Sequence, residues 1–311
     1  MVGARMSPVL PRKGMRMKTR ILLVALALAV SLFALFAYFA GGIGGATTSG
    51  QQSIHLALGN PSDATTDGKD KDNYLMVKPY FALSYNNAKG TPNWVSWHLS
   101  QGDLGKAPRK QRFDTDTELP DGFTRITHGD YTDTGFDRGH MCPHGDRALD
   151  ETMSYATFVM TNIVPQAHQC NAGAWESLEV YERYLAKKGK DLFIVAGPIG
   201  RGGTGTKGQE TTVAHGKVTV PEKVFKVILV VDRTKDADPA KWVNSDARLI
   251  AVIMPNDTSV DDDNWGQYRC SVEDVEKATG LKFFTNAPRE ILAPLKTKVD
   301  TTKPPKLRKS E

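Results

Sequence analysis

The sequence that decides the fold reads Asp137-Arg138-Gly139-His140, then Asn162-Ile163-Val164-Pro165-Gln166, then Asn171-Ala172-Gly173-Ala174-Trp175-Glu176-Ser177-Leu178-Glu179. A histidine near its ordinary pKa can take a proton from water at neutral pH. Arg138 could hold a phosphate or the charge that develops on it, and Gly139 lets the backbone approach a ligand closely. Taken alone, however, a histidine beside an aspartate–arginine ion pair is more often structural than catalytic.

The third cluster predicts a helix that begins near Asn171 and ends at Gly189. Glu179 follows Asn171 by eight residues, which is about 800° of helical rotation, so the two side chains differ by roughly 80° around the axis. Both can face one site while Trp175 and Leu178 face the core. The alternative is that Asn171 only caps the helix and Glu179 lies on a solvated face.

The order and spacing of the three clusters resemble the DNA/RNA non-specific endonuclease family, which includes endonuclease G and the sugar-non-specific bacterial nucleases. A looser similarity runs from about residue 58 to residue 284 and includes Tyr85-Asn86 and Trp94-Val95-Ser96-Trp97. The resemblance implies an α+β protein with a ββα-metal (His-Me finger) nuclease fold, in which a central antiparallel sheet is flanked by helices. His140 would lie on the ββ part, and the helix from Asn171 would be the α part.

The resemblance also implies roles for single residues. His140 resembles the general base that activates water for attack on phosphorus, and Asn171 resembles the direct protein ligand of Mg²⁺, for which Mn²⁺ is the expected substitute. Glu179 resembles the residue that holds the metal-bound waters. Asn162 resembles a residue that supports the metal and the histidine, and Arg138 one that stabilises the charge of the phosphorane. Asp137 is expected to position other groups.

Further arginines are candidates for phosphate binding. The family has an arginine upstream of its signature, and both Arg109 and Arg112 stand near the matching distance from His140. Arg147 resembles an arginine found in some bacterial members. For each of the three, a solvated surface charge is the alternative.

Elementary chemistry agrees with these roles. Mg²⁺ dehydrates reluctantly and keeps several waters, so one protein ligand and a carboxylate that binds those waters suffice. A site that engages only phosphate and sugar reads no base edges. We therefore expect an endonuclease that hydrolyses DNA and RNA, single- or double-stranded, without sequence specificity. The alternatives are a phosphodiesterase of the same fold with a non-nucleic-acid substrate and an inactive nucleic-acid-binding protein. The sequence leaves open whether the protein forms a homodimer.

Short β-branched runs bounded by turn residues predict strands at 80–85, 94–99, 192–196, 224–231 and 249–254. A second helix is predicted over residues 272–279, with Ser271 as its cap, Asp274 three residues on, and Gly280 at its end. Strands and helices do not alternate regularly, which favours an α+β fold.

The N-terminus predicts export. A basic flank precedes an uncharged apolar run at residues 21–40, which is typical of a signal peptide and is also long enough to span a bilayer. We expect residues 1–43 to be a cleaved signal or an uncleaved anchor and residues 44–53 to be a flexible linker. An endonuclease domain would occupy residues 54–295 outside the cytoplasm. The protein would be secreted or periplasmic, or anchored to the membrane by residues 21–40.

The net charge of +5 comes from the two ends of the chain. Residues 1–20 carry +6 and residues 296–311 carry +4, which leaves about −5 for the part between them. Bulk basicity therefore does not indicate nucleic-acid binding, and a phosphate-binding surface must be local. Residues 296–311 contain little to bury and are predicted to be a disordered basic tail.

The three cysteines, Cys142, Cys170 and Cys270, are too few for a disulfide framework. Buried thiols are the first expectation. The alternatives are a bridge from Cys170 to Cys142 or to Cys270, or a zinc site formed by Cys142, His144, His168 and Cys170.

Overall fold

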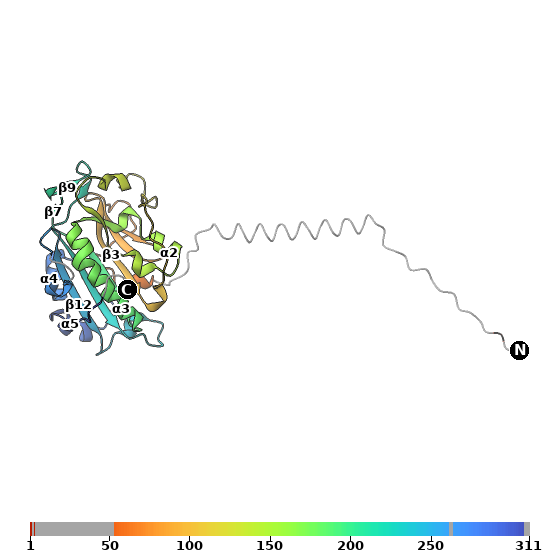
Figure 1. The fold of residues 1–311 in the computed structure, drawn as a ribbon. Helices are drawn as coiled ribbons and strands as arrows, with labels where there is room; N and C mark the ends of the chain where they lie inside the picture. The colour runs from red at the N-terminus through yellow and green to blue at the C-terminus, as the bar shows by residue number, and fades with distance from the viewer. Residues whose placement is uncertain (2, 4–52, 261–263, 308–311) are drawn as a thin grey trace. The chain divides into compact units, whose positions relative to one another are not determined.

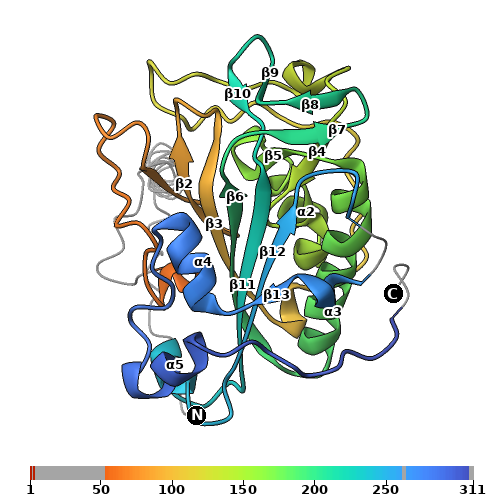
Figure 2. The same cartoon turned by 90° about the vertical axis from the view of Figure 1, so that its left-hand side faces the viewer.

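The computed structural model describes residues 1, 3, 53–260 and 264–307, and its core is an antiparallel sheet of seven strands. The strands lie in the order β1-β2-β3-β6-β11-β12-β13, and each neighbouring pair is antiparallel. Their bounds are Tyr74–Val77, Ala82–Asn86, Thr91–Leu99, Asp191–Ile199, Lys223–Val231, Arg248–Pro255 and Arg269–Cys270. The five strands predicted from apolar runs are thus confirmed as β2, β3, β6, β11 and β12 (Figures 1 and 2).

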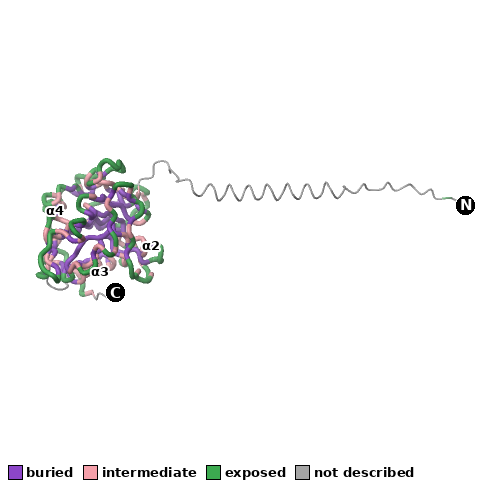
Figure 3. Tube along the Cα trace, turned by 90° about the horizontal axis from the view of Figure 1, so that it is seen from above, coloured by how far each residue is buried: buried purple, intermediate pink, exposed green. Residues whose placement is uncertain are grey.

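Both faces of this sheet are buried, because alternate residues of the central strands enter two different cores. In β3, Trp97 packs into the core that contains residues of helix α3 (Glu176–Lys187), whereas Trp94 packs into the core on the opposite face. Helices α4 (Val272–Thr279) and α5 (Arg289–Lys296) cover that second face, as Figure 2 shows. Figure 3 shows the buried residues gathered in the interior of the domain, with exposed residues around them. The expected α+β fold with helices on either side of a central antiparallel sheet is confirmed.

Helix α4 begins and ends where its sequence predicts. Ser271 Oγ accepts from the backbone N–H of Asp274 at 3.1 Å, and the Asp274 carboxylate accepts from the backbone N–H of Ser271 at 3.0 Å. This reciprocal capping box satisfies two N–H groups that a helix start leaves unpaired. Gly280 ends the helix with a φ of 74°, in the left-handed region that glycine enters without steric cost.

A ββα unit lies beside the main sheet and contains the three polar clusters. Strand β4 (Asp137–His140) pairs with β5 (Ile163–Gln166), and Gly139 lies against Gln166, where a Cβ would come within 2.1 Å of Oε1. A π-helical turn, η6 (Cys170–Trp175), leads into α3. Gly173 interrupts this turn with non-helical angles of φ −100° and ψ −114°. The helix predicted from Asn171 is therefore two pieces joined by a kink.

The remaining elements are short. Helix α2 covers Glu151–Ala156, and two small hairpins pair β7 (Gly203–Gly205) with β8 (Gly208–Glu210) and β9 (Thr212–Val213) with β10 (Val218–Thr219). The described residues also form 3₁₀ turns η1 (Ile54–Leu56), η2 (Gln101–Asp103), η3 (His128–Tyr131), η4 (His144–Arg147), η5 (Met160–Asn162), η7 (Pro239–Trp242) and η8 (Trp265–Tyr268).

The C-terminal segment differs from the prediction of a disordered tail. The Asp300 carboxylate is 5% exposed and receives two hydrogen bonds from Arg248, at 2.7 and 2.8 Å. Arg269 donates to the carbonyl of Thr302 at 2.7 Å, and Leu307 packs against the core. Residues 297–307 are thus held to the domain by the Asp300 carboxylate, the carbonyl of Thr302 and the side chain of Leu307. Residues 308–311 lie outside the described residues.

The predicted signal or anchor and the linker also lie outside the described residues, apart from positions 1, 3 and 53. Within the described residues, no helix has the length and apolar character needed to cross a bilayer. Export, and an anchor at residues 21–40, therefore stay predictions.

Candidate active site

The first and third polar clusters meet at one cavity of about 280 Å³. Strand β4 supplies His140, the π-helical turn supplies Asn171, and α3 supplies Glu179. The cavity is lined by Arg109, His140, Pro143, His144, Gly145, Asn171, Ala172, Glu176, Glu179 and Arg183. The structure thus brings together the residues predicted to be the base, the metal ligand and the water-holding carboxylate.

The His140 imidazole is buried between two aromatic rings. Its centroid lies 4.7 Å from that of Phe158, edge to face, and 5.1 Å from that of Phe113. Nε2 is buried and has no hydrogen-bond partner within the described part of the chain. Burial holds the pKa of His140 well below its usual range, with smaller contributions from Arg109 and His144. The ring is therefore neutral at physiological pH, and a negative charge beside it would raise its pKa and make it a better proton acceptor.

Asn171 is oriented by the first residue of the signature. Its Nδ2 donates to Asp137 Oδ2 at 2.9 Å, and the same carboxylate oxygen lies 2.9 Å from Nδ1 of His168. With the amide nitrogen committed to Asp137, Oδ1 is the end of the side chain available to a cation. Asp137 therefore acts on the cavity through Asn171, as its expected positioning role requires.

Glu179 is a nearly buried carboxylate among several charged groups. Its side chain is 12% exposed, and its Oε2 lies 3.9 Å from Nη1 of Arg183. Burial raises the pKa of Glu179 to about 7, although Lys226 and Arg183 act in the opposite direction. A carboxyl group with this pKa exchanges its proton readily near neutral pH, and a cation in the cavity would favour the ionised form.

Asn162 lies behind the cavity and supports the backbone that follows His140. Its Oδ1 accepts from the backbone N–H of Cys142 at 2.9 Å, and its Nδ2 donates to the carbonyls of Cys142 and Thr157 at 2.8 and 2.9 Å. Its own carbonyl accepts from Met141. These contacts fit a supporting role for Asn162, without direct contact to a ligand in the cavity.

The structure distinguishes between the two upstream arginines. Arg109 lines the cavity, with its Cζ 5.4 Å from the centroid of the Phe158 ring that also packs on His140. Arg112 is exposed and is not among the residues that line the cavity. Arg109 is therefore the one placed to meet a phosphate beside His140.

Arg138 is directed elsewhere. Its guanidinium donates to the carbonyl of His128 at 2.7 and 3.2 Å and to Oγ1 of Thr132 at 3.0 Å. It lines a neighbouring hollow that also includes His168. The structure does not place Arg138 in the cavity with His140, contrary to its expected role at the phosphorane.

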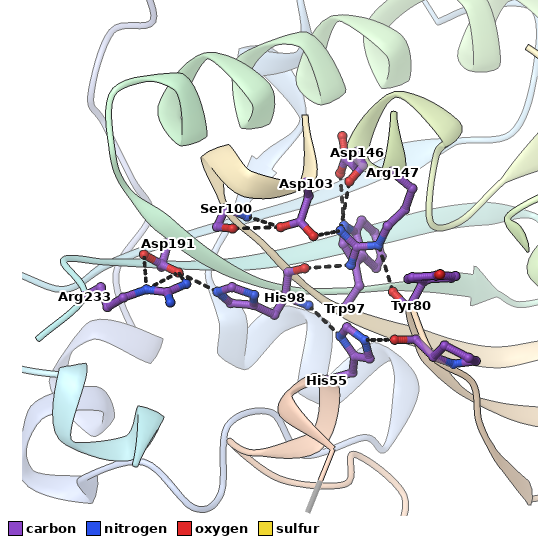
Figure 4. Close-up of polar contacts among 11 residues, drawn as sticks. His55, Tyr80, Trp97, His98, Ser100, Asp103, Asp146, Arg147, Asp191 and Arg233 are labelled. Carbon is purple, nitrogen blue, oxygen red and sulfur yellow. Dashed lines mark hydrogen bonds and ion pairs between the residues drawn. The ribbon is translucent and has the colours of Figure 1, made fainter. Parts of the chain in front are cut away.

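Arg147 is a buried structural residue, so its predicted contact with phosphate is wrong. Its side chain is 1% exposed and its three nitrogens donate to the carbonyls of Tyr80, His98 and Asp146, at 2.8, 2.6 and 2.8 Å (Figure 4). Nη1 also lies 3.3 Å from the Asp103 carboxylate. The guanidinium ties strand β3 to two loops and has no path to a ligand.

Six residues that line the cavity were not predicted as site residues, and three of them are ionisable: Arg183, His144 and Glu176. Arg183 lies four residues after Glu179, so both fall on the same helix face, and this spacing could have revealed it. His144 was considered only as a zinc ligand. Its Nδ1 is buried without a hydrogen-bond partner among the described residues, and burial lowers its pKa to about 4, with Arg109 and Arg183 adding to the effect.

The donor set of the cavity fits a hard, hydrated cation. The cavity is lined by the amide of Asn171 and the carboxylates of Glu176 and Glu179. Six waters at about 30 Å³ each occupy roughly 180 Å³, less than the cavity provides. Within the described ranges, no group of three or more histidine, cysteine, aspartate or glutamate side chains is placed to hold a metal. A cation here would therefore keep much of its water shell.

The cysteines form neither of the alternatives considered. All three are free thiols, so neither bridge is present. Cys142 is buried in the core, whereas the side chain of His168 is 62% exposed. The four residues of the zinc alternative therefore face different environments. Burial raises the pKa of the Cys170 thiol to about 12, which keeps it protonated.

Comparisons with known proteins agree with this geometry. The family model described as DNA/RNA non-specific endonuclease matches residues 59–290. The chain is 43% identical over 248 residues to a nuclease of Nostoc sp. (strain PCC 7120), covering 80% of this chain and 86% of that protein. It is 32% identical over 237 residues to nuclease C1 of Cunninghamella echinulata, covering 74% of this chain and 86% of that protein.

Two further proteins match over most of the same domain. The chain is 35% identical to the mitochondrial nuclease EXOG of Xenopus laevis over 215 residues, which are 67% of this chain and 58% of that protein. A crystal structure of the EndoG/EndoGI complex contains a similar chain, with a TM-score of 0.63 and 25% identity, covering 78% of this chain and 96% of that one. By its signature, its fold and these relatives, the chain belongs to the DNA/RNA non-specific endonuclease family.

Proposed function

We propose that the protein is a Mg²⁺-dependent endonuclease that hydrolyses phosphodiester bonds of DNA and RNA without sequence preference, with His140 as the general base. The observation that supports this most directly is the shared cavity, in which a neutral imidazole, the amide of Asn171 and the carboxylate of Glu179 face one space. The family membership supports the reaction class. Mn²⁺ is the expected substitute for Mg²⁺.

Each side chain has a task that its surroundings explain. His140 accepts the proton of the attacking water, and an anionic phosphodiester nearby would raise its pKa toward the range in which a base is effective. Asn171 offers Oδ1 to the cation because Asp137 holds Nδ2. Glu179 accepts hydrogen bonds from the water shell of the cation. When bound, Mg²⁺ polarises the phosphate and stabilises charge on the leaving oxygen.

Arg109 and Arg183 supply the positive charge for the phosphate. Both line the cavity, whereas Arg138 is bound to His128 and Thr132. A positive charge that is already in place stabilises developing negative charge without the reorganisation that mobile water would need. Side chains that bind phosphate and no base edge would let cleavage tolerate any sequence.

The decisive experiment compares the full chain with its His140→Ala variant. Both are assayed on plasmid DNA and on RNA, with Mg²⁺ and with EDTA. The proposal expects cleavage by the wild type in Mg²⁺ only, and a loss of at least about a hundredfold in the variant with nucleic-acid binding retained. Cleavage by the variant above a few per cent of wild type would show that His140 is not the base. A wild type that binds DNA but cuts none would favour an inactive nucleic-acid-binding protein. A wild type that cuts only small phosphodiesters would favour a phosphodiesterase with a non-nucleic-acid substrate.

A further inference from the structure

Arg183 is enclosed on several sides by groups that fix its guanidinium. Nη1 lies 3.2 Å from Oδ1 of Asp146 and 3.9 Å from Oε2 of Glu179. Gly145 lies against the plane of the guanidinium, where a Cβ would come within 2.9 Å of Nη1 and 3.1 Å of Cζ. The side chain is 16% exposed, and its remaining side lines the cavity.

Asp146 is a fully buried carboxylate whose two oxygens have different partners. Oδ1 accepts from Arg183 at 3.2 Å. Oδ2 accepts from the indole Nε1 of Trp97 at 3.0 Å (Figure 4). Trp97 lies on the central strand β3 and is itself fully buried. Since Arg147 also bonds the carbonyl of Asp146, the carboxylate is fixed relative to the main sheet.

We propose that Asp146 is a positioning residue, which holds Arg183 toward the phosphate and prevents it from closing onto Glu179. This inference rests on the proposed function. A buried carboxylate is costly unless it is paired, so the geometry of Asp146 determines where the guanidinium lies. Gly145 leaves the space that this position requires.

The effect of Asp146 on Glu179 follows because both carboxylates compete for the guanidinium of Arg183. Arg183 and Glu179 are four residues apart on α3 and could form a close ion pair, but they are 3.9 Å apart because Nη1 bonds Asp146 at 3.2 Å. Without the charge of Asp146, the guanidinium would move onto Glu179 and occupy the oxygens that hold the water shell of the metal. The loss of Asp146 should therefore weaken metal binding as well as turnover.

The test uses Asp146→Asn, which keeps an oxygen for Trp97 and nearly the same volume but removes the charge. We expect kcat to fall about thirtyfold with KM for DNA within threefold, because a preorganised charge acts in the transition state. The dissociation constant for Mn²⁺, measured by titration calorimetry without substrate, should rise about fivefold.

Gly145→Ala is an independent way to move the same guanidinium, since its Cβ would meet Nη1. It should reproduce the loss of kcat. The matched control is Gly129→Ala, in the exposed turn η3, where the nearest contact of a Cβ would be Thr127 Oγ1 at 3.7 Å. This control should keep wild-type kcat, KM and Mn²⁺ affinity.

A double-mutant cycle separates positioning from general damage to the fold. In an Arg183→Gln background, Asp146→Asn should lower kcat by less than twofold, because the group that it positions is gone. The proposal is overturned if the two losses multiply, or if Asp146→Asn alone keeps kcat and Mn²⁺ affinity within twofold of wild type. If Asp146→Asn does not fold, the same cycle with Gly145→Ala decides.

Failure of the proposed function would look different. A wild-type protein that cuts no nucleic acid would refute the nuclease assignment. The Mn²⁺ titrations of the Asp146, Gly145 and Gly129 variants would still show whether Asp146 keeps Arg183 away from Glu179.

Discussion

Cation binding at the cavity should depend on pH through Glu179. The carboxyl is nearly buried and its pKa is raised to about 7, with burial as the largest cause. The cation requires the ionised form. One unit below this pKa about a tenth of the group is ionised, and one unit above it about nine tenths. The apparent dissociation constant for Mn²⁺ should therefore rise about tenfold between pH 8 and pH 6.

Neither Asn171 nor His140 produces this dependence. The amide of Asn171 does not titrate, and the depressed pKa of His140 leaves its ring neutral at both pH values. Glu182 needs a control, because burial also raises its pKa and it lies beside Lys226, whose Nζ is 3.1 Å from its Oε1. Glu182→Gln should keep most of the tenfold change.

The assay is titration calorimetry of the nuclease with Mn²⁺ at pH 6, 7 and 8 in buffers of matched ionic strength. Proton release, obtained by comparing buffers of different ionisation enthalpy, should approach about one per cation at pH 6 and vanish at pH 8. Glu179→Gln should bind weakly with no change across the range. A wild-type dissociation constant that varies by less than twofold would refute the reasoning that links burial of Glu179 to metal binding.

Further predictions concern the arginines and stability. Arg109→Ala should lower kcat/KM about ten- to a hundredfold whereas the exposed Arg112→Ala stays within threefold, a comparison that steady-state kinetics on DNA makes directly. Arg147→Ala should reduce the free energy of unfolding by about 3 kcal/mol or more, since it leaves the carbonyls of Tyr80 and His98 unpaired. Urea denaturation measures this change. An unchanged midpoint together with a loss of DNA binding would instead favour a contact between Arg147 and phosphate. Glu179 binds a proton more tightly in the metal-free fold than in the unfolded chain, so its own contribution to stability is fully present below the unfolded pKa of about 4.5 and is lost as pH rises through about 7. The melting temperature of the wild type relative to Glu179→Gln, both in EDTA, should show this loss, and saturating Mg²⁺ should offset it more at pH 8 than at pH 6.

Local signals in the sequence were sufficient for the chemical identity of the site and for several elements. The capped helix from Ser271 to Gly280 follows from interactions within ten residues, and its ends are confirmed. The five long strands follow from short apolar runs that can only be buried in a sheet. The three clusters predicted a base, a metal ligand and a carboxylate on a ββα unit, and these residues do line one cavity.

Other features depend on which distant residues pack together, and no local pattern contains that information. Asp300 pairs with Arg248 across 52 residues and turns a predicted tail into part of the domain. Arg109 and Arg112 have similar sequence surroundings, and only the fold places one of them beside the Phe158 ring. The kink at Gly173 also changes the helical geometry assumed between Asn171 and Glu179.

The sequence by itself determined which chemical groups this protein contains and roughly where along the chain they act, because helix caps, strand periodicity and motif spacing are short-range properties. Only the tertiary structure decided the electrostatic state of those groups. Arg147 is buried among backbone carbonyls, Arg183 lines the cavity, and the pKa of Glu179 is raised to about 7. The physical reason is that the burial of a charged group and the electrostatic field around it are set by residues distant in the sequence. Trp97 bonds the buried Asp146 from 49 residues away, and Lys226 bonds the buried Glu182 from 44 residues away.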